Sequence, residues 1–483
     1  MLVNSIPFWI FFPIVAIPYF LLLKKSAKAQ NIWLLLVSYF FYGYAEIKMI
    51  PIILIATVVF YFLGIQIQKD NTNNPKRASW LTTLGVVLGV GMLVYFKYMN
   101  FLIAEFAALF ERMGLYTNMS TFKILMPLGI SYFTFKLMSY VIEIHREKID
   151  ASRDPISFAT FVAFFPTIMA GPIDRPNEFL PQLDNERKFK FDMMSEGLKR
   201  ILWGMFLKMC VADCLDNCIG AIYGNYMHHN ATTITMAAIF YFFEAYTDFC
   251  GYSHMAVGVG QILGIRIREN FNRPLLGQNI TDLWRRWHMS LTTWITDYIF
   301  IPLNVKFRDW GVWGIYAATF INMIIVGAWH GANWTYVVFG IYHGILMCIA
   351  LSIEKKRKKF EKKHNLKKKT YWIYPRILFT WVLFTIGTTL FRSDSLTDYY
   401  KMMNHALDAG FGPLWVGGLV QPIPAMGALA IVLFKEWKDE TGRNINFLHS
   451  QNYFVRAFSV AALISMILFI GALDGGNFIY FQF

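Results

Sequence analysis

The chain has 483 residues, of which 56% are hydrophobic, 18% are aromatic and only 16% are charged, and its formal net charge is +14. This composition excludes a soluble globular protein and is typical of a polytopic membrane protein. The basic residues are concentrated between apolar runs. The charge therefore indicates membrane topology, and we expect a lipid bilayer and no nucleic acid as partner.

Apolar runs that approach the length of a membrane helix, about 20 residues, recur along the chain. They cover residues 7–23, 33–45, 50–67, 80–98, 124–144, 158–170, 202–219, 232–263, 312–329, 334–353, 372–391, 416–434 and 454–473. Several are short or are interrupted by Gly and Pro, as in tilted or re-entrant helices. We therefore predict an all-α fold with about 11–13 transmembrane or re-entrant helices.

The first apolar run has no basic residue before it, whereas Lys24, Lys25 and Lys28 follow it. This order differs from that of a cleavable signal peptide and predicts a first span whose N-terminus lies outside. Five other basic segments then fall on the cytoplasmic side, namely 69–77, 146–153, 187–200, 355–369 and 435–443. We expect a multi-pass membrane protein.

The most basic of these segments, residues 355–369, reads KKRKKFEKKHNLKKK and contains ten Lys or Arg residues. We interpret it as a basic cytoplasmic loop that precedes three C-terminal helices. Binding of anionic lipid or of a nucleotide-bearing substrate is the alternative. Without a soluble domain or a linker in the sequence, residues 1–483 are predicted to form one membrane-embedded domain.

Metal or cofactor chemistry has little support in the sequence. Cys210, Cys214 and Cys218 recur at a helical spacing, but small buried apolar side chains explain them better than a thiolate metal site does. The sequence contains neither a phosphate-binding Walker loop nor an HExxH zinc helix. We expect no metal site and no bound cofactor.

Residues 279–303 combine aromatic and polar residues in a helical pattern. In a continuous helix, Arg285, His288 and Thr292 fall on one face. Asp297 would then lie on the opposite side and could orient His288 only if the helix breaks. The alternative is an amphipathic helix at the membrane interface, with its Arg and His facing lipid headgroups.

His330 follows a long apolar stretch and is flanked by glycines. An ionisable side chain at membrane depth indicates a functional site, and burial disfavours the charged imidazole, which leaves the neutral form that a general base requires. The alternative is a structural histidine bonded to a backbone carbonyl or to Asn322. Asn333 can line the same site or cap the next helix. His343 is interpreted as structural.

Five blocks, in order along the chain, resemble the membrane-bound O-acyltransferase family, in particular its bacterial branch of alginate O-acetylation membrane proteins. The blocks are PLGISYFTFKLMSYVIEIHR (127–146), FFPTIMAGPIDRPNEFLPQL (164–183), YTDFCGYSHMAVGVG (246–260), ENFNRPLLGQNITDLWRRWHMSLTTWITDYIFIPL (269–303) and GAWHGANWTYVVFGIYHG (327–344). The chain departs from the branch pattern at His254, where Asp is usual, and at NVKFRDWG (304–311), where a glycine-rich turn is expected.

The resemblance implies a bundle of helices in a bacterial inner membrane, pinched at its centre, with a cytoplasmic and an outer funnel. It places His330 at the family's catalytic histidine and His288 at its second polar active-site residue. As substrate-binding candidates in the matching blocks we take Asn333, Trp329, Arg285 and Asp248.

The implied activity is the transfer of an acyl group, expected to be acetyl from acetyl-CoA, by His330 acting as a general base. In this branch the group passes outward, often to a secreted or membrane-tethered partner of the serine-hydrolase type, and then to a cell-surface glycan. One alternative is D-alanyl transfer from a carrier protein to teichoic acid. Another, of a different class, is a transporter or channel with a path lined by His288 and His330.

Overall fold

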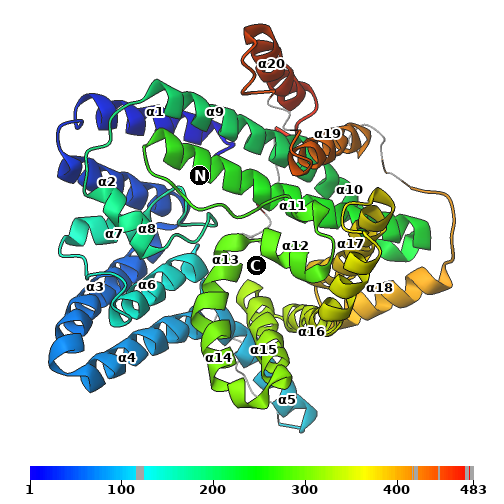
Figure 1. Ribbon diagram of the computed structural model, residues 1–483, viewed down its shortest axis with the longest axis horizontal. Coiled ribbons are helices and arrows are strands. Elements are labelled where there is room, and N and C mark those ends of the chain that lie inside the picture. Colours follow the sequence, from blue (N-terminus) through cyan, green and yellow to red (C-terminus); the bar gives the residue numbers. More distant parts are fainter. Residues whose placement is uncertain (116–123, 416, 418–421, 444–446, 474–477, 479–483) are drawn as a thin grey trace. The chain divides into compact units, whose positions relative to one another are not determined.

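The computed structural model describes residues 1–115, 124–415, 417, 422–443, 447–473 and 478. These residues form helices and connecting segments without a β-strand among them, which confirms the predicted all-α class (Figure 1). They group into two compact units: a first unit of Met1–Ile201 with His254–Arg268, and a second unit of Leu202–Ser253 with Glu269–Phe483. The single domain expected for residues 1–483 stays a prediction.

Five helical segments of the described chain are long and apolar enough to cross a membrane. They are Ala27–Asn73, Pro75–Arg112, Val312–His330, Trp334–Lys363 and Thr370–Arg392, and two apolar helices, Ile6–Leu21 and Tyr453–Phe469, are shorter. The protein is therefore a multi-pass membrane protein, while the count of about 11–13 membrane helices stays a prediction.

The first unit contains the N-terminal helices and a network of buried polar groups. Its helices are α1 (Ile6–Leu21), α2 (Ala27–Glu46), α3 (Ile50–Asn73), α4 (Pro75–Leu93), α5 (Met99–Arg112), α6 (Ile130–His145), α7 (Pro155–Ala163), α8 (Pro176–Phe179) and most of α9 (Phe191–Met205). The helix predicted over 158–170 ends at Ala163, shortly before Pro166, whose ring lacks the N–H that a helix interior needs.

Two buried cations hold parts of the first unit together. Arg187 donates from Nε to the Tyr19 hydroxyl at 2.7 Å and from Nη2 to Asn31 Oδ1 at 2.6 Å. Its burial was not expected for a residue at the start of a predicted basic cytoplasmic segment. Lys136 lies 3.8 Å from the Asp174 carboxylate, so it joins two of the blocks that carry the family resemblance.

The second unit contains the remaining helices. They are α10 (Asp213–Tyr223), α11 (Ala231–Ile262, of which the part to Ser253 belongs here), α12 (Ile280–Arg286), α13 (Met289–Ile295), α14 (Ile301–Lys306), α15 (Val312–His330), α16 (Trp334–Lys363), α17 (Thr370–Arg392), α18 (Leu396–Asp408), α19 (Pro422–Glu440) and α20 (Tyr453–Phe469). Four described helices thus follow the basic run, instead of three. The missed helix, α18, has many polar residues and forms no apolar run. The predicted span over 416–434 begins outside the described residues.

The basic run is mostly helical, so its interpretation as a loop over 355–369 is wrong. α16 continues to Lys363 and leaves only the last residues of the run outside a helix. Pairs one turn apart support this extension, because Lys358 lies 2.6 Å from the Glu354 carboxylate and Arg357 lies 3.8 Å from that of Glu361. Lys, Arg and Glu are also good helix formers.

Helices α15 and α16 pack closely against each other, and glycine permits the approach. A Cβ on Gly340 would lie 2.6 Å from the Met323 carbonyl oxygen and 3.0 Å from the Ile324 Cα. Both obstacles are backbone atoms of α15, so a side chain here would push the two helices apart. The hairpin leads directly to the end of α15, where His330 lies.

We therefore expect Gly340→Ala to destabilise the protein by about 1–3 kcal/mol through overpacking. Gly427→Ala in α19 is the matched control, since a Cβ there would meet no described atom within 4 Å, and it should be neutral or stabilising. Thermal unfolding of both variants in detergent measures the difference. Equal melting temperatures would contradict the close packing.

Candidate active site

His330 lies at the end of α15, where it is 5% exposed. Its imidazole centroid is 5.0 Å from the ring of Phe391 and 6.2 Å from that of Phe339, and both pairs meet edge to face. Gly331 then leaves the helical conformation, and Asn333 is the N-cap of α16. The residue is thus enclosed by apolar rings at a helix end, which agrees with the burial expected from its apolar surroundings.

His288 lies at a break between two short helices. α12 ends at Arg286 and α13 begins at Met289, and His288 between them is left-handed, with φ 43° and ψ 52°. The continuous helix predicted over 279–303 is therefore wrong. A left-handed conformation costs an L-residue about 1–2 kcal/mol, and such strain is characteristic of functional sites.

The break arises because a distant segment takes the backbone hydrogen bonds. The Asn272 N–H donates to the Arg286 carbonyl at 3.0 Å, and the Met289 N–H donates to the Asn270 carbonyl at 2.8 Å. The helix cannot continue with these groups occupied, so the chain turns at His288. The ENFN segment, residues 269–272, therefore determines where the imidazole lies.

The Asn270 side chain fastens this segment from both sides. Its Nδ2 donates to Ser253 Oγ on α11 at 3.0 Å, and its Oδ1 accepts from Ser290 Oγ on α13 at 2.6 Å. Sequence reasoning missed Asn270 and Ser253, although both lie in blocks that resemble the family. A polar residue in a non-helical segment directly before a predicted site is a signal that could have pointed to Asn270.

Trp329 brings the two histidines into one site. Its ring centroid lies 5.5 Å from that of His288 and 5.2 Å from that of His330. The ring of Phe249 on α11 also contacts His288, with 4.6 Å between the two ring centroids. The structure thus brings His288 next to Trp329 and His330, two adjacent residues that lie much further along the chain. The three side chains surround one enclosed centre.

Asn333 holds the turn next to His330. Its Oδ1 accepts from the Thr335 N–H at 3.1 Å and so caps α16, while its Nδ2 donates to the Asp394 carbonyl at 2.7 Å. The capping role considered from the sequence is confirmed. Its role in substrate binding stays a prediction.

Arg285 does not share a helix face with His288 and Thr292, because α12 ends before His288. Arg285 is exposed, whereas His288 is fully buried. The shared face was deduced from an unbroken helix, and the break removes that basis. Arg285 interacts electrostatically with Glu354 of α16, and its role in substrate binding stays a prediction.

Asp248 belongs to a buried ionic triad. Lys208, in a π-helical segment over Phe206–Ala212, lies 2.6 Å from the carboxylates of both Asp248 and Asp213. All three side chains are at most 4% exposed. The triad links three consecutive segments of the second unit, and Asp248 lies one residue before Phe249, which contacts His288. Substrate binding by Asp248 stays a prediction.

His343 is packed as a structural residue, in agreement with the sequence interpretation. Its Nδ1 accepts a hydrogen bond from Trp284 Nε1 at 3.4 Å. On its other side the ring lies against α17, where a Cβ on Gly387 would collide with it. The side chain fills the space between α12, α16 and α17.

We expect Asn270→Ala to lower kcat by about 10- to 100-fold, because loss of both hydrogen bonds lets the turn that carries His288 shift. The folded fraction should stay high, since the backbone bonds of the segment remain. Asn452→Ala is the control, because it also removes two side-chain hydrogen bonds, those that cap α20. Catalytic turnover measures the effect, and an unchanged kcat in Asn270→Ala would show that the anchor is dispensable.

Comparison with known proteins identifies the class of this multi-pass helical membrane protein. Residues 34–393 match the model of "MBOAT, membrane-bound O-acyltransferase family". The chain therefore belongs to the membrane-bound O-acyltransferase family, and it is an O-acyltransferase.

Three similar proteins illustrate the family's range. "Probable alginate O-acetylase AlgI" of Pseudomonas putida is 33% identical over 401 residues, which are 81% of this chain and 77% of that protein. "Peptidoglycan O-acetyltransferase" of Helicobacter pylori is 29% identical, with coverage of 81% and 77%. "Teichoic acid D-alanyltransferase" of Bacillus subtilis is 32% identical but covers only 48% of this chain and 61% of its own length.

Proposed function

We propose that the protein transfers an acetyl group from acetyl-CoA in the cytoplasm toward a polysaccharide or a partner protein outside the bacterial inner membrane, with His330 as general base. The observation that carries the proposal is the enclosed pair His288 and His330, both next to the Trp329 ring. Acetyl is preferred as the acyl group because relatives named for O-acetylation cover most of this chain.

In the proposed reaction, neutral His330 accepts the proton of an acceptor hydroxyl as its oxygen attacks the thioester carbonyl. The new C–O bond forms, the C–S bond breaks, and the departing thiolate takes up the proton from His330. His288 holds the acceptor or stabilises the developing charge. Asn333 keeps the turn after His330 in place through its two hydrogen bonds.

The orientation of the donor follows from the basic segments. The helical end of α16 carries several lysines and an arginine, and the end of α19 carries Lys435 and Lys438, and such ends belong on the cytoplasmic side of the membrane. In this proposal the N-terminus is outside and the basic segments are cytoplasmic, as the positive-inside rule predicts. Acetyl-CoA is anionic, so this side attracts it.

The acceptor side requires a second component in this proposal. We propose a secreted or membrane-tethered partner of the serine-hydrolase type, which completes transfer to a cell-surface glycan. D-alanyl transfer from a carrier protein is the second candidate, and the similarity to the teichoic acid D-alanyltransferase supports it over about half of the chain.

The test is donor consumption by the purified full chain in lipid vesicles. Radiolabelled acetyl-CoA and a D-alanyl-loaded carrier protein are offered separately, each with the soluble acceptor fraction of the source cell envelope. We expect thiol release and label transfer with acetyl-CoA only. Transfer from the carrier alone would replace the proposal by D-alanyl transfer, and turnover of neither donor by folded protein would overturn both.

A further inference from the structure

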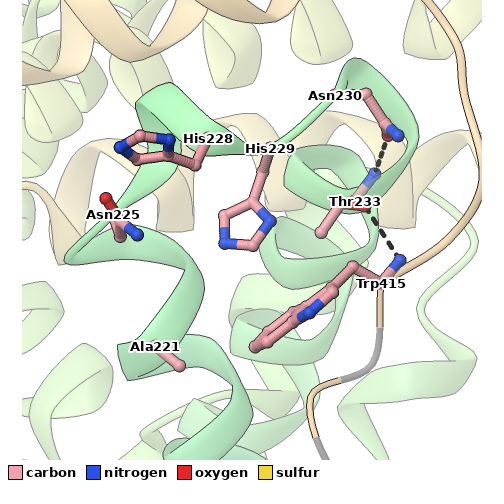
Figure 2. A pocket seen from close by; sticks show the side chains of 7 residues that line it. All are labelled: Ala221, Asn225, His228, His229, Asn230, Thr233 and Trp415. Carbon is pink, nitrogen blue, oxygen red and sulfur yellow. Dashed lines mark hydrogen bonds between the residues drawn. The ribbon is translucent and has the colours of Figure 1, made fainter.

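A cavity of about 430 Å³ opens beside the turn between α10 and α11 (Figure 2). Its lining includes Asn225, His228 and His229 from this turn and Trp415 from the segment after α18. All of these residues belong to the second unit. The cavity is separate from the enclosed centre at His330, since it is lined by none of the residues described there.

The walls of the cavity are fixed by hydrogen bonds, two of which are drawn in Figure 2. Asn230 Oδ1 accepts from the Thr233 N–H at 3.0 Å and caps α11, and Thr233 Oγ1 accepts from the Trp415 N–H at 3.1 Å. Asn230 Nδ2 also donates to the Pro413 carbonyl at 2.7 Å. Two segments far apart in sequence are thus tied together, which holds Trp415 opposite the α10–α11 turn.

The groups that face the cavity combine an aromatic plane with unused polar groups. The Trp415 side chain is 42% exposed, and the His229 ring lies 4.8 Å from it between centroids, tilted by 47°. Within the described part of the chain, the side chains of Asn225 and His228 make no hydrogen bond, and both are exposed. Amide and imidazole groups can both donate and accept, as a sugar hydroxyl does.

Contacts within the second unit connect the cavity wall to the active site. Tyr223 lies between two lining positions, and the Arg392 guanidinium lies 5.8 Å from its ring centroid. The neighbouring residue, Phe391, packs on His330. The end of α17 therefore connects the cavity wall to the active site, and a ligand in the cavity would lie on that side of the active site.

The cavity also lies at the membrane face opposite the basic ends. α17 begins directly after the basic run and ends at Arg392, and the chain then reaches Trp415 before α19, whose last turns carry Lys435 and Lys438. Twenty-three helical residues, the length of α17, suffice to cross a bilayer. With the basic ends cytoplasmic, Trp415 is extracytoplasmic.

We propose that this cavity binds a pyranose ring of the acceptor glycan. Trp415 provides the plane on which the apolar face of the sugar stacks, and Asn225, His228 and His229 bind its hydroxyl groups. The inference rests on the proposed function, in which a cell-surface glycan is the final acceptor on this side of the membrane. A cavity of about 430 Å³ accommodates a sugar unit with part of its neighbour.

The experiment measures binding of two fluorescently labelled tetrasaccharides, one cut from alginate and one of β-1,4-linked N-acetylglucosamine, to the full chain in nanodiscs without an acyl donor. We expect at least one to bind. Trp415→Ala should then raise Kd about tenfold and Asn225→Ala about fivefold, whereas Trp415→Phe stays within about threefold because it keeps an aromatic plane. Trp310→Ala, at an exposed tryptophan outside the cavity lining, should bind like the wild type.

The outcomes separate this inference from the proposed function. Wild-type protein that binds neither tetrasaccharide, or Trp415→Ala that binds as well as wild type, overturns the sugar site even if acetyl-CoA is consumed. Intact sugar binding in a chain that consumes no acetyl-CoA leaves the site standing and removes the proposed function. Loss of acyl transfer to a partner protein in Trp415→Ala, with unchanged sugar binding, assigns the cavity to a protein partner and overturns the proposal.

Discussion

His330→Ala should lower acyl transfer by about 10²- to 10⁴-fold, the range that a positioned general base contributes. The side chain is enclosed by Phe391, Phe339 and Trp329, so water cannot readily replace its function. Turnover of radiolabelled donor by purified protein in lipid vesicles measures the loss. His330→Gln should be equally inactive, because an amide can hydrogen-bond but is not a base.

The matched control is His343→Ala, which also removes a buried histidine of the second unit. This imidazole accepts a hydrogen bond from Trp284 and packs against α17. We expect its loss to lower the melting temperature but to retain kcat per folded molecule, the reverse of the pattern for His330. Near wild-type turnover in folded His330→Ala would remove the general-base mechanism.

Lys208→Met should destabilise the protein by about 3–5 kcal/mol, the cost of leaving buried carboxylates without their cation. Lys208 lies 2.6 Å from both Asp213 and Asp248, and the three side chains are nearly inaccessible. Methionine retains the length and apolar stem of the side chain, so the change tests the charge more than the packing. Thermal or denaturant unfolding in detergent measures the effect.

Two comparisons isolate the ionic contribution. Lys358→Met removes a lysine that also lies 2.6 Å from a carboxylate but is 68% exposed, and it should cost about 0–1 kcal/mol. In the double variant Lys208→Met with Asp248→Asn, part of the lost stability should return, because one buried charge is removed with its partner. A loss at Lys208 no larger than that at Lys358 would show that the triad does not support the fold.

The sequence predicted well what depends on composition and on short-range pattern. The apolar runs at 312–329, 334–353 and 372–391 correspond to α15, α16 and α17, because a long apolar stretch in a membrane has to satisfy its backbone groups within a helix. The burial of His330 was expected for the same reason, since the residue ends a long apolar stretch, and it is confirmed. The burial of His343 and the cap at Asn333 are also local features.

The features that sequence reasoning missed depend on segments distant in the chain. Nothing between residues 279 and 303 signals that Asn272 and Asn270 will take the hydrogen bonds of Arg286 and Met289, so a continuous helix was the natural expectation. Similarly, Asp248 gave no sign that its partner would be Lys208. In contrast, the extension of α16 into the basic run is a local feature. It was missed because the run was interpreted from its positive charge as a cytoplasmic loop, without regard to the helix propensity of its residues and the ion pairs within the helix.

The turn that carries His288 is held largely through backbone atoms, and this has a consequence for the range of sequences that can form it. The N–H groups of Asn272 and Met289 are the donors, and every amino acid except proline supplies such a donor. Side-chain identity at these two positions can therefore drift during evolution while the imidazole keeps its place. Proline is the one residue that cannot supply the bond at either position. Functional variants should therefore carry diverse residues at positions 272 and 289, but never proline.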